Sequence, residues 1–425
     1  MIRSFVLLFV SAAFLAQASV QRDSLDPMFE RFPFEGWMSA PDAGPFHFSV
    51  RVPQAELSFH QRLESQIEIT LDGKDLENRR GDGRLLVLVQ ITDREGTRYQ
   101  EHLSMELDKL EDDVKHANLE YAFPAFFLPG EYSAEIALVH AGADEHGGKH
   151  VQFRVAAPKH EFLLGAWRDL PSVEFIGDKE SPDNWYLPSV KGRVQWADSV
   201  HAPARLNVIL NVVPAAQVRG SRSSSSRDLS ALLPTLKVIS QTGSSSISEN
   251  IELLDLARQR AVFQQSDGHD LDWPRLRASL GEANTASIDV RSLSGQRQDA
   301  QFFVSQVRSI IHASNGPCVL VVLTKAVAFA SGEDLEPISL EGLPACRVFY
   351  IRYQSSPRYS MPAFARPPMG GRDRDVPMGT PRPRYRLPIE VDQLEATLKP
   401  LRPKVFEVET PEQMAMAIAE IEKQL

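Results

Sequence analysis

The first half of the chain alternates apolar and polar residues in short runs. The runs lie between residues 46 and 155 and are separated by Gly, Asp and Pro turns: HFSVRV, SQIEITL, RLLVLVQI, EYAFPAFFL, GEYSAEIALV and HVQFRV. A side chain on every second position faces the same side of a strand, so this alternation predicts half-buried strands. Their regular spacing predicts a β-sandwich over residues 46–156.

One motif refines this prediction. The stretch FLPGEY, residues 127–132, places Tyr132 at the start of a late strand. It resembles the tyrosine corner of Ig-like sandwiches, in which such a tyrosine bonds back to nearby backbone. We therefore expect the sandwich to be Ig-like.

From residue 204 to residue 425 the pattern changes to strands that alternate with helices. Asp272 precedes Trp273 and Pro274 as a helix cap, and TPEQ at 410–413 is a capping box. This alternation predicts an α/β domain with a doubly wound, mostly parallel sheet. The expected strands are LNVILNVV, a pair within NIELLDLARQRAVFQQ, CVLVVLT, CRVFYIRY and KVFEVE, with helices over 229–239, 300–312, 391–398 and the C-terminal stretch.

Residues 157–203 form an aromatic and proline-rich bridge between the two predicted domains. Trp167, Trp185 and Tyr186 in this bridge could form a carbohydrate platform, because aromatic faces bind apolar sugar faces. Scattered aromatic residues in a connector more often pack domains together. We expect packing.

The N-terminus has the pattern of a signal peptide over residues 1–18. Arg3 precedes an apolar run over 5–16, and Ala16-Gln17-Ala18 forms a small-residue cleavage site. A polar and aromatic lead-in, residues 19–45, follows. The pattern predicts an exported protein, periplasmic or extracellular, without a membrane span.

Composition narrows the class of partner. The net charge is -10, with 46 Lys and Arg against 56 Asp and Glu. Binding to nucleic acid needs a basic face to neutralise phosphate, so this charge argues against nucleic acid as a partner. We expect a protein partner, of unknown identity, in the cell envelope or outside the cell.

The element order of the second domain resembles that of a von Willebrand factor A domain. The strand ending VVLTK and the closing stretch LEATLKPLRPKVFEVETPEQMAMAIAEI are similar to the corresponding parts of that family. The sandwich and its GAWRDLPSVEF bridge resemble what precedes the domain in exported bacterial proteins of the von Willebrand factor A-related group. The resemblance covers most of the chain from Phe32 onward.

The resemblance implies a metal-ion-dependent adhesion site, and this sequence departs from it. The family pattern has Asp-x-Ser-x-Ser after the first strand and Thr-Asp-Gly after a later one, which supply oxygen ligands to a cation. Here the positions read Asn211, Val213 and Ala215, with Lys325 after the later strand. These changes remove ligands and add a positive charge, so we expect a degenerate site with no metal and no cofactor.

Two low-complexity loops follow forward-running strands, over residues 219–227 and 355–388. Long loops rich in Pro, Gly and Arg are often disordered insertions. The alternative is a contact surface, because Arg and Tyr are enriched at interfaces and guanidinium groups bind carboxylate or phosphate through forked hydrogen bonds. The candidate partner-binding residues are Arg366, Arg372, Arg382, Arg384, Arg386 and Tyr385.

Cys318 and Cys346 begin two strands that are neighbours in the resembling fold. Their Cα atoms could therefore lie within reach of a disulfide, which an exported location permits. Two buried free thiols are the alternative.

Other candidate chemistry is weak. His140, His146 and His150 lie in VHAGADEHGGKH, whose glycines predict a flexible, solvated hairpin tip rather than a metal site. The sequence has no Gly-x-Ser-x-Gly and no His-Glu-x-x-His. We expect a non-catalytic, metal-independent module for protein binding or adhesion, and the alternative is a hydrolase acting on an envelope or extracellular polymer.

Overall fold

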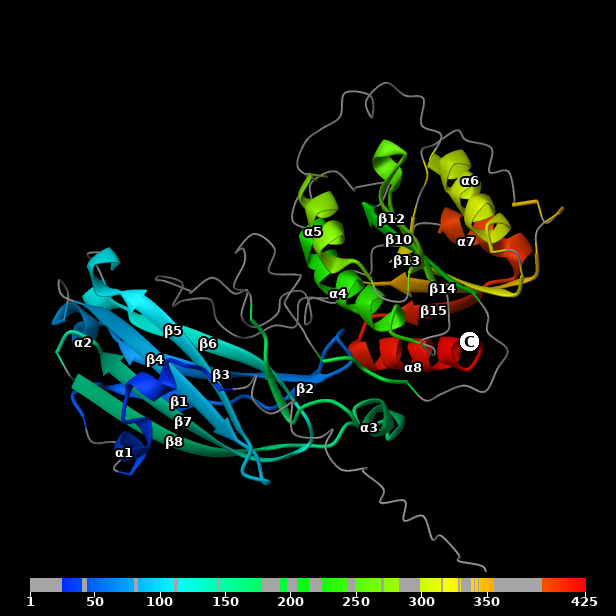
Figure 1. Cartoon of the computed structure of the whole chain (residues 1–425). Coiled ribbons are helices and arrows are strands. Elements are labelled where there is room, and N and C mark those ends of the chain that lie inside the picture. Colours follow the sequence, from blue (N-terminus) through cyan, green and yellow to red (C-terminus); the bar gives the residue numbers. More distant parts are fainter. Residues whose placement is uncertain are drawn as a thin grey trace, which may run out of the picture. The chain divides into compact units, whose positions relative to one another are not determined.

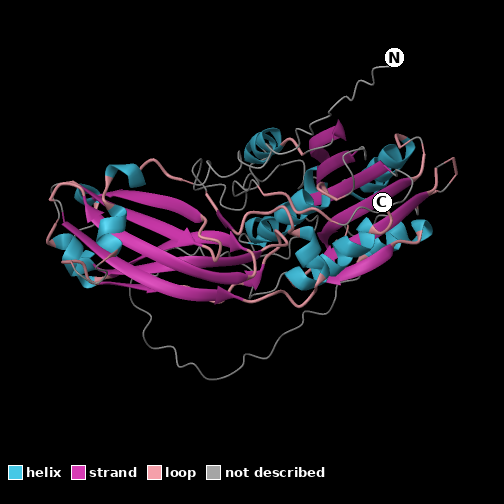
Figure 2. Cartoon of the chain, turned by 60° about the horizontal axis from the view of Figure 1, so that its bottom comes forward, coloured by secondary structure: helices cyan, strands magenta, loops and turns pink. Residues whose placement is uncertain are grey.

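The computed structural model contains three β-sheets and a set of helices (Figures 1 and 2). Its chain forms two compact units, one of Met1–Val50, Thr70–Leu119 and Glu131–Arg154, the other of Arg51–Ile69, Glu120–Gly130 and Val155–Leu425. The predicted signal peptide lies outside the described residues. The structure describes residues 25–39, 44–79, 83–110, 114–143, 145–177, 192–196, 205–213, 224–242, 249–268, 271–282, 299–314, 316–327, 329, 338–339, 341–342, 344–354 and 392–425.

The strands of the first half form two of the three sheets. A five-stranded sheet has the order β1-β3-β6-β9, with β2 paired to β3, and a four-stranded sheet has the order β5-β4-β7-β8. The pairings of β4 with β5 and β7, and of β6 with β9, are antiparallel. The strands are β1 (Phe48–Arg51), β2 (Glu56–Leu57), β3 (Leu63–Asp72), β4 (Arg84–Thr92), β5 (Arg98–Glu106), β6 (Asn118–Phe127), β7 (Gly130–His140), β8 (Glu145–Val155) and β9 (Val173–Phe175).

The lead-in covers part of the four-stranded sheet. Its short helices are η2 (Phe29–Arg31) and α1 (Phe34–Met38). Phe29 and Phe34 pack in one cluster with Leu86 and Leu88 of β4. Burial of apolar side chains is the main favourable term in folding, and here it explains why β4 is buried along nearly its whole length instead of on alternate residues.

The histidine-rich segment differs from the expectation of a flexible tip. The turn is short, because β7 continues to His140 and β8 begins at Glu145. The ring of His146 stacks on Trp37 with centroids 4.6 Å apart. A Cβ at Gly147 would lie 3.3 Å from Phe46 Cβ, so this glycine permits close packing. The glycines that indicated a loose tip are therefore part of a strand.

The third sheet is six-stranded, with the order β12-β11-β10-β13-β14-β15. Five strands are parallel, and β12 is antiparallel to β11 at one edge. Burial on both faces explains why β13 reads as a continuous apolar run. The strands are β10 (Arg205–Val213), β11 (Glu249–Asp255), β12 (Arg260–Gly268), β13 (Cys318–Lys325), β14 (Cys346–Tyr353) and β15 (Lys404–Val408).

Helices cover both faces of this sheet, with α4 and α5 on one face and α6 and α7 on the other (Figure 1). The predicted caps are confirmed: the Arg275 N–H donates to Asp272 Oδ1 at 3.1 Å, and α8 begins with a capping box of Thr410 and Gln413. Within the described part of the chain, no helix is long and apolar enough to cross a membrane. These helices are α4 (Ser224–Ile239), α5 (Trp273–Glu282), α6 (Asp299–His312), α7 (Gln393–Leu398) and α8 (Pro411–Glu422).

Short helical segments lie in the connections. They are α2 (Gly73–Glu77), η3 (Leu107–Lys109), η4 (Val114–His116), α3 (Phe162–Ala166), η6 (Leu256–Arg258) and η9 (Lys399–Leu401).

The two cysteines form a disulfide, as the sequence predicted. Cys318 and Cys346 occupy paired positions where β13 and β14 begin. Their Cα atoms lie 4.5 Å apart, within the range that a disulfide spans. The bond joins the first residues of two adjacent parallel strands.

Candidate functional site at the carboxyl end of the parallel strands

Three neighbouring strands of the six-stranded sheet bring the candidate site residues to one edge. Leu210 of β10 pairs with Leu323 of β13, which places Asn211 beside Thr324. Lys325, at the end of β13, pairs with Tyr353, at the end of β14. Open α/β sheets bind ligands outside the carboxyl ends of their strands, so this edge is the candidate site.

Asn211 and Thr324 meet on one face of this edge. Asn211 Nδ2 donates to Thr324 Oγ1 at 3.2 Å, and both side chains are buried. Buried polar groups need such partners because an unmade hydrogen bond costs about 1–3 kcal/mol. The predicted site residue Asn211 thus has a structural partner within the sheet.

Lys325 points to the opposite face, because successive residues of a strand alternate. Its Nζ lies 2.5 Å from Asp228 Oδ2, on helix α4. The carboxylate side chain is 6% exposed and the lysine side chain 23% exposed. A carboxylate this deeply buried needs a paired charge, and Lys325 supplies it.

Tyr353 completes this face of the edge. Burial, and secondarily the negative charge of Asp228, raise the pKa of its phenol. Phe59 packs edge-on against the Tyr353 ring, with centroids 5.7 Å apart. The ion pair of Lys325 and Asp228 therefore lies beside a buried neutral phenol.

A second network occupies the other face, and sequence reasoning missed it. Arg352 Nη1 lies 2.9 Å from Glu395 Oε2 and 3.3 Å from Asp392 Oδ2, and Arg352 also pairs with Glu407. Tyr350 Oη donates to Asp392 Oδ2 at 2.8 Å. The network ties β14 to α7 and β15. Asp392 and Glu395 fall within the predicted helix over 391–398, and no spacing pattern in the sequence links them to Arg352.

Two basic side chains, His60 and Arg62, lie just before β3. Arg62 pairs with Glu174 of β9. Burial, and secondarily the charges of Lys237 and Arg62, lower the pKa of His60 to about 3. His60 is therefore neutral at physiological pH and is suited to packing rather than to a charge switch.

Two tryptophans of the aromatic bridge, Trp167 and Trp196, are described, and both are buried, which fits the expectation of packing. Trp167 is 2% exposed, and its Nε1 donates to the Gln61 carbonyl oxygen at 2.8 Å. Gln61 Nε2 in turn donates to the Pro411 carbonyl oxygen at 3.2 Å. Trp185 and Tyr186 lie outside the described residues.

The other positions of the predicted degenerate metal site are only partly described. The side chain of Val213 and the whole of Ala215 lie outside the described residues. Among the residues that are described, no group of three His, Cys, Asp or Glu ligand atoms converges at this edge. The other two positions have described side chains. Asn211 donates to the Thr324 hydroxyl, and Lys325 pairs with the Asp228 carboxylate.

The predicted partner-binding residues cannot be placed. They belong to the long segment 355–391, which lies outside the described residues. The predicted partner-binding residues are Arg366, Arg372, Arg382, Arg384, Arg386 and Tyr385.

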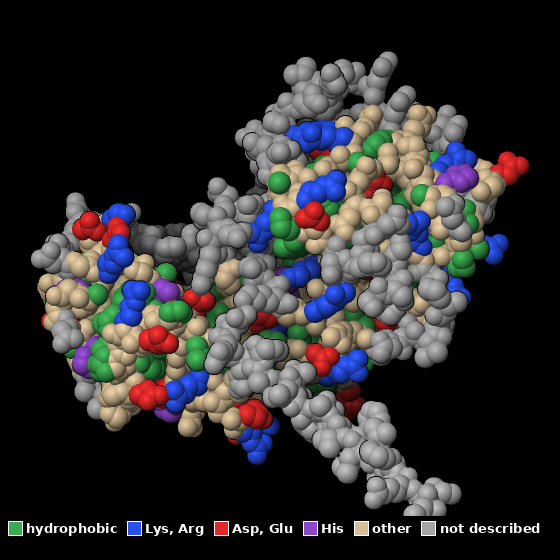
Figure 3. All heavy atoms as spheres, in the orientation of Figure 1, with side chains coloured by type: hydrophobic (Ala, Val, Ile, Leu, Met, Phe, Trp, Pro, Cys, Tyr) green, Lys and Arg blue, Asp and Glu red, His purple; other side chains and the backbone are tan. Residues whose placement is uncertain are grey.

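Among the described residues, Figure 3 shows Lys and Arg side chains interspersed with Asp and Glu over the displayed face.

No family model matches the chain, and no curated protein matches it. A glycosyl hydrolase family 2 member from Bacteroides cellulosilyticus is 13% identical over 26% of this chain and 15% of that chain, with a TM-score of 0.18. A structural genomics target is 17% identical over 28% of this chain and 91% of its own, with a TM-score of 0.19.

A Bordetella pertussis protein described as ApaA is 17% identical over 28% of this chain and 98% of its own, with a TM-score of 0.17. The matched part spans less than a sixth of the glycosyl hydrolase. At these TM-scores the likenesses carry no argument about the function of this chain.

Proposed function

We propose that this protein is an exported, non-catalytic module for protein binding or adhesion that works without a metal ion. In this proposal an Ig-like sandwich precedes a degenerate von Willebrand factor A-like domain. The order of strands and helices from β10 to α8 supports the assignment, because it follows the order on which the sequence resemblance rests. The antiparallel edge strand β12 fits the predicted strand pair.

The ion pair of Lys325 and Asp228 carries the proposal. A divalent cation at the carboxyl end of a sheet would provide positive charge there. Lys325 Nζ, 2.5 Å from Asp228 Oδ2, supplies a fixed positive charge that needs no metal. It also opposes entry of a cation, because like charges repel strongly where the dielectric constant is low.

Partner contact would then come from the loops that leave this edge. The segment 355–391 follows β14, and the segment 214–223 follows β10. Both strands run toward the edge that holds Lys325. Guanidinium groups on such loops could hold carboxylate groups of a partner by paired hydrogen bonds.

Two observations support export. The disulfide between Cys318 and Cys346 is consistent with an oxidising compartment, since structural disulfides are rare in reducing cytosol. The predicted signal peptide would deliver the chain there. The periplasm and the extracellular space both meet this requirement.

Capture of partners from an envelope fraction tests the proposal. The full chain is expected to retain the same partners with and without EDTA, and to lose them as salt screens the exposed charges. Two loop variants make the test specific. One changes five arginines to serine, and the other changes them to lysine: Arg366, Arg372, Arg382, Arg384 and Arg386.

The serine variant is expected to bind at least about tenfold more weakly, with the lysine variant between it and the unchanged chain, because lysine keeps the charge but not the forked geometry. If the unchanged chain, the serine variant and the lysine variant capture partners equally well, the five arginines do not contribute to binding. Loss of capture in EDTA would show that the interaction depends on a metal.

A further inference from the structure

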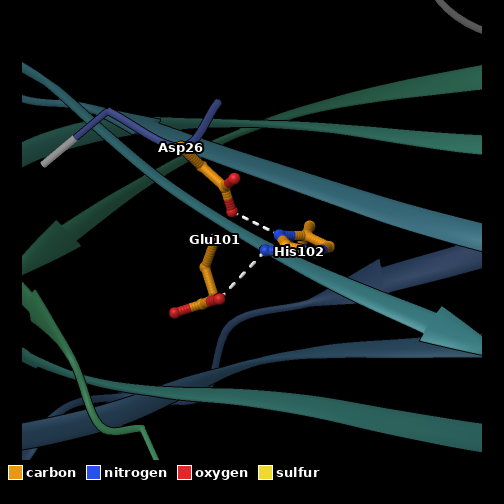
Figure 4. Close-up of side chains that lie close together, drawn as sticks. All are labelled: Asp26, Glu101 and His102. Atoms are coloured by element: carbon orange, nitrogen blue, oxygen red, sulfur yellow. Dashed lines mark hydrogen bonds and ion pairs between the residues drawn. The ribbon is translucent and has the colours of Figure 1, made fainter. Parts of the chain in front are cut away.

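Three side chains with metal-binding atoms converge on the edge strand β5. Asp26, Glu101 and His102 each offer one ligand atom, and these atoms lie within 4.8 Å of one another (Figure 4). This is the only such group among the residues that the structure describes. It lies far along the sequence from the carboxyl edge of the parallel sheet.

The fold brings Asp26 to this strand through the lead-in. Phe29 and Phe34 pack on Leu88 of β4, and His102 is the cross-strand partner of Leu88. Burial of the two phenylalanines therefore holds Asp26, three positions before Phe29, beside His102. The site joins two segments that are 76 residues apart in the chain.

A row of side-chain amides orients Asp26. The Asp26 N–H donates to Gln100 Oε1 at 3.1 Å. Gln100 Nε2 donates to Gln90 Oε1 at 2.7 Å, and Gln90 Nε2 donates to Glu135 Oε2 at 2.8 Å. This row crosses β5, β4 and β7, and Gln90 is only 3% exposed. The backbone of Asp26 is thus fixed by a network that is not part of the ligand set.

The two carboxylate oxygens of Asp26 have different partners. Oδ1 accepts the Met28 N–H at 3.0 Å. Oδ2 is in close contact with His102 Nδ1. Hydrogen bonds of this kind are what hold metal ligands in place in known sites. One oxygen is therefore used to orient the side chain, and the other is aimed at the imidazole.

We propose that Asp26, Glu101 and His102 form a binding site for a divalent transition-metal ion of the zinc class. One imidazole nitrogen and two carboxylate oxygens are ligands that zinc accepts at about 2.0–2.2 Å. Imidazole also separates zinc from calcium and magnesium, which prefer oxygen ligands alone. The ion binds the lone pair of His102 Nδ1 and takes the place of the hydrogen bond between Nδ1 and Asp26, while the single ring hydrogen of the neutral imidazole sits on Nε2.

The site would fasten the lead-in to the sheet. Asp26 belongs to the lead-in, whereas Glu101 and His102 belong to β5. The side chains of Asp26 and His102 are 14% and 27% exposed, so both remain partly open to solvent. The inference does not depend on the proposed function, because it concerns a different segment of the chain.

Calorimetric titration of the full chain with zinc tests the proposal, with magnesium and calcium as comparison ions. One saturable zinc site per chain is expected. His102→Gln and Glu101→Gln should each weaken zinc binding at least about 100-fold, because even changes to groups around a site cost about 10–100-fold in affinity. Gln100→Ala, which leaves all three ligands in place, is expected to cost about tenfold.

His47 provides a matched control. His47 Nδ1 lies 3.0 Å from Asp75 Oδ2, so it forms the same type of histidine–aspartate pair outside the three-residue group. His47→Gln should leave zinc affinity unchanged. Circular dichroism identifies any variant that fails to fold, and cobalt absorption of the unchanged chain then reports the ligand set directly.

Absence of saturable zinc binding in the full chain would overturn the proposal and leave a simple ion pair. So would zinc binding that survives His102→Gln and Glu101→Gln in folded protein. Equal loss in the His47→Gln control would show nonspecific binding to histidine.

Discussion

At the carboxyl end of the parallel sheet the carboxylate of Asp228 meets the ammonium of Lys325, whereas on β5 the carboxylate of Asp26 meets the imidazole of His102. Both arrangements pair a partly enclosed acid with a nitrogen base. An ammonium has no lone pair to give, so it can only neutralise the acid. A neutral imidazole has a lone pair and can bind a metal ion through it.

The type of nitrogen beside a buried carboxylate decides what that carboxylate can do. With Lys325 as its partner, Asp228 is part of a fixed internal charge pair. With His102 as its partner and Glu101 nearby, Asp26 is part of a potential ligand set. The following predictions test each half of this contrast.

The largest expected effect comes from removing the ammonium. Lys325→Met leaves Asp228 buried without this partner, and breaking a buried pair from one side costs about 3–5 kcal/mol. We expect the low end of that range, about 3 kcal/mol, because Lys325 is partly exposed. Urea unfolding measures the change.

The double variant Lys325→Met with Asp228→Leu is the control. Removing both charges together often costs little, so most of the lost stability should return. If Lys325→Met is as stable as the unchanged chain, the ion pair contributes nothing to the free energy of unfolding, and Asp228 does not need Lys325 as a paired charge.

Metal addition tests the other half. Zinc at 100 times its dissociation constant should stabilise the chain by about 2.7 kcal/mol if it binds only the folded state. In His102→Gln this gain should disappear, because the site has lost its nitrogen ligand. Thermal unfolding with and without zinc measures the difference, and an equal gain in both proteins would contradict the site.

Glu64 is a third carboxylate in a protected position, and it should make the stability of the chain depend on pH. Burial raises the pKa of Glu64 from 4.5 to about 7, opposed by a hydrogen bond from Ser58. A pKa raised in the folded state means that stability from this group is present below pH 4.5 and is lost as pH rises through about 7.

Glu64→Gln removes this loss. The variant should be more stable than the unchanged chain by about 1.5 kcal/mol at pH 8.5 and equally stable near pH 4.5. This gain is smaller than a fully buried carboxylate would give, because Glu64 is only half-buried and solvent screens its charge. Urea unfolding at the two pH values decides, and a gain of the same size at both would assign the effect to packing.

The smallest expected effect is at Asn211. Asn211→Ala removes the hydrogen bond to Thr324, which is expected to cost about 1 kcal/mol. Thr324→Val should cost a similar amount, and the two changes together should cost less than their sum because they share one contact. If the two losses of stability are fully additive in this double-mutant cycle, Asn211 and Thr324 do not stabilise the chain through their mutual hydrogen bond.

The sequence predicted elements well where local chemistry decides them. Alternation and capping residues identified β4, β7 and the starts of α5 and α8. Edge strand β5 was missed because its residues, RYQEHLSME, are mostly polar, and an exposed edge strand needs little apolar surface. The glycines of β8 led to the wrong prediction of a flexible tip. Gly147 instead permits close packing against Phe46, a tertiary contact that the local sequence does not reveal.

The sites were harder to predict than the strands. Lys325 could be named as a charge at the end of β13, but its partner Asp228 is 97 residues away in the chain and only the fold joins them. The group on β5 was missed for the same reason, since Asp26 reaches His102 only when the lead-in packs on the sheet. Ligand sets built from distant segments leave no spacing pattern.

Calorimetry with magnesium and calcium tests the central claim, that the Lys325–Asp228 pair makes the carboxyl edge independent of metal. The measurement is made on the full chain carrying His102→Gln, so that the site on β5 does not contribute. No saturable heat is expected for either ion, because Lys325 already supplies the positive charge. A micromolar site that is lost on Asn211→Ala would contradict the account.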